Sequence, residues 1–282
     1  MLRLRTMSTF RGACSRRVDP SPDRRTPGHI LPQVWRCVDG PTEGGPREDP
    51  RVSAPTRPPA PAWGVVVPAG GRGSRLGGVD KPALDLGGRG LLEHLLDGLP
   101  AGVPVALVGP PRPLALEVDR PVLRCREEPP GGGPAAALAA GVATLLAGAV
   151  PAARGDGLAQ DGLDVVVVLP GDAPHAAAAV PALLSALSRS PGAEAAVAVD
   201  AGGRRQVLVA AHRAGALAGR VAELGREQGL AGLPAARLLP PADRLVEVAV
   251  DADLLADVDS PGDLERLEHL HRLRRARGAG PA

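Results

Sequence analysis

The chain has 282 residues, enough for one or two domains, and a net charge of only +2. Two Trp, one Phe and no Tyr leave it without the aromatic surfaces on which nucleic-acid bases stack. Its three cysteines, Cys14, Cys37 and Cys125, are odd in number and lack CxxC spacing, so we expect neither a disulfide framework nor a structural metal site. We therefore expect no nucleic-acid or membrane partner, a cytoplasmic location, and a monomer or weak homo-oligomer.

Residues 1–62 differ in composition from the rest of the chain. They contain eleven Arg, six acidic residues and many Pro, but few apolar clusters. Such a segment buries too little apolar surface to offset the entropy lost on ordering, so we predict a disordered extension. From Trp63 onward, Val/Leu runs alternate with Ala/Leu-rich stretches, which predicts one folded domain over 63–277 and a disordered tail over 278–282.

The apolar runs within this domain are short, continuous and bounded by turn residues. This pattern is typical of strands buried on both faces of a mostly parallel sheet. Strands are expected at 64–68, 103–108, 164–169 and 245–250, a short strand ending at Cys125, a hairpin over 195–211, and helices at 90–98, 134–148, 176–188 and 261–275. The alternation predicts an α/β fold with a doubly wound sheet and right-handed crossovers.

The final predicted helix is amphipathic. Leucines recur at helical spacing over 261–275, at Leu264, Leu267, Leu270 and Leu273. We therefore expect this helix to lay one apolar face on the domain.

A glycine-rich loop, AGGRGSRLGGVDKP, follows the first predicted strand. Glycines at the carboxyl end of such a strand let backbone N–H groups approach a phosphate closely. Arg72, Arg75 and Lys81 lie on this loop and would repel one another without an anion to share. The dinucleotide fingerprint fails at Leu76, and a GxxxxGK[ST] loop is excluded because Asp80 precedes the lysine.

Lys81 is the chain's only lysine, against 32 arginines. A composition this rich in arginine suggests that lysine has been replaced wherever charge alone mattered. An ammonium is a compact point charge that fits between phosphate oxygens, whereas a guanidinium is a wide planar fork. The retained lysine indicates a crowded phosphate contact.

The loop resembles the signature of the nucleotidyltransferases that include molybdenum cofactor guanylyltransferase, with matches at Ala69, Gly70, Gly71, Arg75, Leu76, Gly77, Asp80 and Lys81. Segments 127–141, 169–174 and 257–264 resemble the family's later motifs, in the same order. The resemblance implies a Rossmann-like, glycosyltransferase-A-like nucleotidyltransferase fold. It also implies Mg2+-dependent transfer of a nucleoside monophosphate, from GTP, to molybdenum-carrying molybdopterin.

Other functions stay open at this point. Relatives of this kind use CTP on the same pterin, or guanylylate phospholactate. A protein that binds nucleotide without turnover, acting as a cofactor carrier, is an alternative of another class. Pyrophosphate release separates the enzyme from the carrier.

Carried over by position, the resemblance assigns roles to individual residues. Lys81 and Arg75 would be catalytic, and Asp172 and Asp259 would hold Mg2+. The nucleotide would contact Ala69, Gly70, Gly71, Arg72, Ser74, Lys81, Glu128, Gly133 and Asp172.

Each acidic assignment has a structural alternative. Asp172 could be a turn residue, and Asp259 could cap the last helix. The family's base-reading acid corresponds here to Pro130, so Glu128 is the expected substitute, unless Glu127 and Glu128 are both solvated loop charges. His175 is expected to be structural, because a phosphate nucleophile needs no general base.

Overall fold

The structure is a computed structural model that describes residues 62–70, 80–117, 120–148 and 162–276. The extension predicted for 1–62, apart from Ala62, and the tail predicted for 278–282 lie outside these residues. The elements are β1 (Trp63–Pro68), η2 (Lys81–Ala83), α1 (Leu91–Asp97), β2 (Val105–Val108), β3 (Val122–Cys125), α2 (Pro134–Gly148), β4 (Val165–Val168), η3 (Ala176–Ala179), α3 (Val180–Arg189), β5 (Ala195–Val199), β6 (Arg205–Arg213), α4 (Ala214–Glu227), η4 (Ala235–Leu238), η5 (Ala242–Arg244), β7 (Leu245–Ala249), η6 (Ala252–Leu254) and α5 (Pro261–Ala276).

The strands form a seven-stranded sheet in the order β3-β2-β1-β4-β6-β5-β7. All neighbouring pairs are parallel except those of β6, which is antiparallel to β4 and β5. The register pairs Pro68 with Val108, and Val66 with Val168, so the carboxyl ends of β1, β2 and β4 share one edge. Arg213 pairs with Val165, so β6 ends at the opposite edge. The predicted mostly parallel, doubly wound sheet is confirmed.

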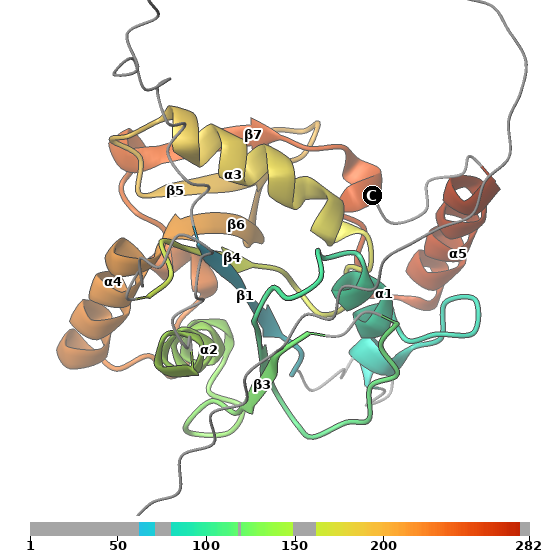
Figure 1. Ribbon diagram of the computed structural model, residues 1–282, viewed down its shortest axis with the longest axis horizontal. Coiled ribbons are helices and arrows are strands. Elements are labelled where there is room, and N and C mark those ends of the chain that lie inside the picture. Colours follow the sequence, from blue (N-terminus) through green and yellow to red (C-terminus); the bar gives the residue numbers. More distant parts are fainter. Residues whose placement is uncertain (1–61, 71–79, 118–119, 149–161, 277–282) are drawn as a thin grey trace, which may run out of the picture. The chain divides into compact units, whose positions relative to one another are not determined.

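Helices cover both faces of the sheet (Figure 1). Apolar residues of α1 and α3 pack on one face, and those of α2 and α4 pack on the other. Helix α2 approaches β1 closely, because a Cβ added to Gly141 would lie only 2.3 Å from Val66 Cγ1. This contact fixes α2 against the central strand, and α2 begins beside the edge where β1, β2 and β4 end.

The last helix packs on a separate, smaller apolar cluster formed by Leu86, Leu91, Val258 and Leu267. Of the four leucines predicted to face inward, Leu267 is fully buried, whereas Leu273 is 41% exposed. A small apolar cluster thus holds the segment before α5 near η2 and α1.

Helix α4 was missed by the sequence prediction. Its sequence, AGALAGRVAELGRE, contains three glycines, each of which costs about 1 kcal/mol relative to alanine in a helix interior. Leu217 and Leu224 are nonetheless fully buried against the sheet. Tertiary packing outweighs the weak helix propensity here. Within the described residues, no helix has both the length and the apolar character needed to cross a bilayer.

Candidate active site

A cavity of about 820 Å3 opens at the edge where β1, β2 and β4 end. Segments far apart in sequence form its walls. They are the end of β1, η2, the turn after β2, the β3–α2 connection, the turn after β4 and the segment before α5. The lining residues are Pro68, Gly70, Lys81, Pro82, Pro110, Arg126, Glu127, Pro130, Gly131, Gly133, Pro134, Ala137, Pro170, Asp172, Leu208 and Asp259.

Closely packed backbone supports the cavity at Ala69 and Gly70. Ala69 N donates a hydrogen bond of 2.7 Å to Val108 O. Gly109 has a φ of 149°, and a Cβ there would lie 2.9 Å from Ala69 C and Gly70 N. Ala69 is buried, whereas Gly70 is exposed and lines the cavity. An exposed glycine at this place lets a ligand approach the main chain.

Lys81 opens η2 and is directed to the acidic segment before α5. Its Nζ lies 2.5 Å from Asp259 Oδ1, and its side chain is 18% exposed. The first turn of α5 is closed by other groups: Ser260 N donates to Asp263 Oδ2 at 2.8 Å, and Asp263 N donates to Ser260 Oγ at 3.3 Å. Ser260 and Asp263 therefore cap α5, while the Asp259 carboxylate is turned to Lys81.

Asp172 follows β4 and lines the same cavity as Lys81 and Asp259. Burial, and then the charge of Asp257, raise the pKa of its carboxyl, although its own backbone N–H and Lys81 act in the opposite direction. Removal from water and the charge of Asp259 likewise raise the pKa of Asp257. The charged forms of these carboxyls are thus disfavoured by burial and by one another, and an added cation would stabilise them.

Asp257 was missed by the sequence analysis, although the DVD spacing at 257–259 puts its carboxyl near that of Asp259. In the described part of the chain, no group of three His, Cys, Asp or Glu side chains has the geometry of a metal site. On the side of the cavity that holds Lys81, the oxygen donors are the carboxylates of Asp172 and Asp259. This set fits Mg2+, which proteins hold through one or two carboxylates together with substrate phosphates.

The β3–α2 connection forms the opposite wall. Glu127 lines the cavity, and its Oε1 accepts a 2.9 Å hydrogen bond from Gly131 N. Glu128 is exposed and is absent from the lining. Gly133 and Pro134 bring the start of α2 to the cavity, and the first turn of this helix has no acidic residue. A helix start of this kind favours an anionic ligand.

The structure does not bear on every residue named from the sequence. Gly71, Arg72, Ser74 and Arg75 lie outside the described residues. His175 is absent from the lining; its ring stacks on that of His271 with centroids 5.6 Å apart, and burial lowers its pKa to about 4.

Arg126 lines the cavity and was not predicted. The end of β3 places it there. Its position follows from the strand pairing rather than from any motif, so the sequence held no signal for it.

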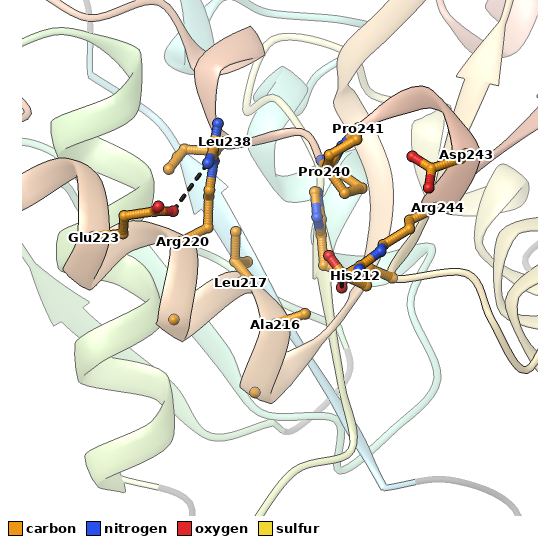
Figure 2. A pocket seen from close by; sticks show the side chains of 13 residues that line it. His212, Ala216, Leu217, Arg220, Glu223, Leu238, Pro240, Pro241, Asp243 and Arg244 are labelled. Atoms are coloured by element: carbon orange, nitrogen blue, oxygen red, sulfur yellow. Dashed lines mark hydrogen bonds and ion pairs between the residues drawn. The ribbon is translucent and has the colours of Figure 1, made fainter.

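A second cavity, of about 360 Å3, lies beside α4 near the end of β6 (Figure 2). Its arginines are paired: Arg220 Nη1 lies 2.9 Å from Glu223 Oε2, and Arg244 Nη1 lies 2.6 Å from Glu194 Oε1. His212 points into it from β6 with 4% of its surface exposed, and burial lowers its pKa to about 4. None of the residues predicted for the site lies here.

Known structures share the fold of this chain. The Rv0371c homologue from Mycobacterium sp. strain JC1 is 22% identical over 75% of this chain and 98% of its own, with a TM-score of 0.53. Rv0371c from Mycobacterium tuberculosis H37Rv is 24% identical over 75% and 100%, with a TM-score of 0.51. CMP:2-keto-3-deoxy-manno-octonic acid synthetase, solved with CTP, is 19% identical over 76% and 99%, with a TM-score of 0.52. At these identities the likeness concerns the fold alone.

Sequence comparison reaches further than structural likeness. No curated protein gives a significant match. The family model described as MobA-like NTP transferase domain matches residues 65–242, which is more than half of the chain. The chain therefore belongs to the MobA-like NTP transferase family and is a nucleotidyltransferase.

Proposed function

We propose that the protein transfers GMP from GTP to the phosphate of molybdenum-carrying molybdopterin and releases pyrophosphate. The observation that carries this proposal is the single cavity of about 820 Å3 that brings together Lys81, Asp172, Asp259 and the exposed backbone of Gly70. This volume is within the range of small-molecule sites and can hold a nucleotide beside a second phosphorylated substrate.

The reaction is an in-line displacement at phosphorus. An oxygen of the acceptor phosphate forms a bond to the α-phosphorus, and the bond from the α-phosphorus to the bridging oxygen breaks, so the electron pair leaves with pyrophosphate. The acceptor phosphate is already ionised and needs no base, in agreement with the location of His175. Catalysis then consists of positioning and electrostatic stabilisation.

Residues of this chain supply most of those interactions. Lys81 would stabilise the triphosphate and the departing pyrophosphate, together with Arg75, and the backbone at Gly70 and at the start of α2 would hold phosphate oxygens. Mg2+ would be held by Asp172 and Asp259 and would neutralise charge on the phosphates. The contact of Asp259 with Lys81 orients the ammonium before substrate binds.

Base recognition is assigned to Glu127 in place of Glu128. Of these two glutamates, Glu127 is the one that lines the cavity, and one oxygen of its carboxylate accepts a hydrogen bond from Gly131 N. Guanine presents N1–H and N2–H2 on one edge, a pair of donors that a carboxylate can accept together. Glu128 is exposed outside the lining, so the chain would have to rearrange for it to reach the base.

A substrate screen tests the proposal. The purified protein is incubated with Mg2+, each of the four NTPs, and either molybdenum-molybdopterin, metal-free molybdopterin or phospholactate, and pyrophosphate release is measured. The fastest release is expected with GTP and molybdenum-molybdopterin. A faster reaction with CTP or with phospholactate would overturn the substrate assignment, and nucleotide binding without any pyrophosphate release would instead indicate a carrier.

A further inference from the structure

Arg112 lies just behind the cavity and is not part of its lining. It stands between Pro111 and Pro113 in the segment after β2, and its side chain is only 6% exposed. The two prolines restrict the backbone around it. Its own carbonyl accepts a 3.0 Å hydrogen bond from Arg124 Nη1, which ties this segment to β3. The guanidinium is thus held on a rigid base.

The guanidinium contacts two residues that flank 71–79. Arg112 Nη2 donates a 2.5 Å hydrogen bond to Ala69 O, immediately after β1. Arg112 Nη1 lies 3.0 Å from Asp80 Oδ1, immediately before Lys81. One planar group therefore joins the end of the central strand, through a hydrogen bond, to the residue before η2, through an ion pair. A guanidinium can do this because its nitrogens point in different directions.

We propose that Arg112 is a positioning residue for nucleotidyl transfer, which holds the Ala69 carbonyl and the Asp80 carboxylate and thereby sets where the adjacent Lys81 presents its ammonium to the phosphates. It acts through Lys81 and touches no substrate. The inference rests on the role proposed above for Lys81. The inference also gives Asp80 a role, because its carboxylate forms the ion pair with Arg112. Asp80 thus differs from Asp172 and Asp259, whose carboxyls face the cavity.

Loss of the contacts of Arg112 with Ala69 and Asp80 should slow the reaction by a predictable factor. Displacement of a catalytic group by about 1 Å can cost about 10²-fold in rate. We expect Arg112→Ala to lower kcat/KM for NTP by about this factor. Arg112→Lys would keep the charge but could reach only one of the two partners, so it should recover little of the loss.

The test is a double-mutant cycle of Arg112 with Lys81. For each variant, kcat/KM is measured from pyrophosphate release, with the NTP and acceptor that react fastest in the substrate screen. If Arg112 acts through Lys81, then Arg112→Ala lowers kcat/KM in the wild-type background but causes no further loss in Lys81→Ala. Multiplying losses would show that the two residues act independently and would overturn the inference.

Arg220→Ala is the matched control for stability. Arg220 also joins a carboxylate, Glu223, to a backbone carbonyl, that of Arg237, but it lines the second cavity. It should lower the melting temperature with kcat/KM unchanged. The same behaviour in Arg112→Ala would overturn the inference. If Arg112→Ala does not fold, Asp80→Asn breaks the ion pair from its other end, and the same cycle with Lys81 applies to it.

Failure of the inference and failure of the proposed function give different results. Wild-type kcat/KM in Lys81→Ala would overturn the role of Lys81, and the inference with it. A strongly impaired Lys81→Ala beside a fully active Arg112→Ala would overturn the inference alone.

Discussion

The two cavities differ in how their charged side chains are paired. At the larger one, the pKa of the lining Asp172 and that of the nearby Asp257 are raised by burial first and by neighbouring carboxylates second. In the smaller one, Arg220 and Arg244 each lie within 3 Å of a carboxylate oxygen, and a buried histidine has a lowered pKa (Figure 2). The described linings of both cavities hold two cations and three acids, but the arginines of the smaller one are each paired with a carboxylate, whereas carboxyls crowd one another around Lys81 at the larger one.

This difference suits the larger cavity to binding charged ligands, whereas the smaller one is a pocket between packed elements. Crowded like charges raise the free energy of the folded protein, and they become favourable when a ligand supplies the opposite charge. The arginine–carboxylate pairs of the smaller cavity already neutralise one another and gain nothing comparable from a ligand. Substitutions in the larger cavity should therefore change turnover more than stability, and substitutions in the smaller one should change stability alone.

The largest effect is expected for Asp172→Asn. Turnover at ordinary Mg2+ should fall by at least ~10²-fold, because the site loses a charged oxygen ligand. The melting temperature should not fall, since the raised pKa shows that the folded state disfavours the charged form. Asp243→Asn, which removes an acid from the smaller cavity, is the control and should keep full activity. Measurement of pyrophosphate release across a Mg2+ titration checks both. A drop in melting temperature with activity retained would instead make Asp172 a turn residue.

Lys81→Arg should be nearly as damaging as Lys81→Ala, at ~10²–10³ in kcat. The ammonium has little room, because its side chain is 18% exposed and its Nζ lies 2.5 Å from Asp259. A guanidinium is wider and cannot occupy the same spot. Arg272→Lys on α5, an exposed cation, should leave kcat unchanged. Near-full turnover by the arginine variant would show that the chain's only lysine has no special role.

Much of the fold could be predicted because its strands are unambiguous. The run VVVV of β4 has no helical period, and its residues are fully enclosed. Helix α4 could not be predicted, because its stability comes from contacts of Leu217 and Leu224 with the sheet rather than from its glycine-rich sequence.

Motifs in the sequence named residues that the structure brings to one cavity, whereas residues brought together by folding alone were missed. Lys81, Asp172 and Asp259 belong to motifs and do line one cavity. Arg112 lies 32 positions beyond Asp80 and belongs to no motif, so only the structure reveals that it contacts both Ala69 and Asp80. Glu127 and Glu128 are adjacent, and sequence alone could not tell which one faces the cavity.

His212 should make stability depend on pH without affecting turnover at neutral pH. Its folded-state pKa of about 4 lies below its ordinary value of 6.5, so its contribution is complete above pH 6.5 and is lost as the pH falls toward 4. The full loss is on the order of 3 kcal/mol in the free energy of unfolding. His212→Gln should make this dependence less steep in urea unfolding measured from pH 7 to 4, while His175, whose pKa is also lowered to about 4, keeps its own share. His269→Gln, at an exposed position on α5, should leave it unchanged. An equally steep dependence in both variants would contradict the prediction.

The smallest effect separates the two adjacent glutamates in the wall of the larger cavity. Glu127→Gln should lower the preference for GTP over CTP by ~1–3 kcal/mol, the usual size for a lost buried polar pairing, because an amide cannot accept both guanine donors. Glu128→Gln is the matched control: it makes the same change one residue away, outside the lining, and should leave the ratio as it was. Competition between GTP and CTP for each purified variant gives the ratio directly. A changed ratio in Glu128→Gln alone would return base recognition to Glu128, and a wild-type preference for CTP would remove the guanine assignment from both. Since neither substitution touches Lys81 or Asp172, a change in the ratio would report recognition of the base rather than damage to the phosphate site.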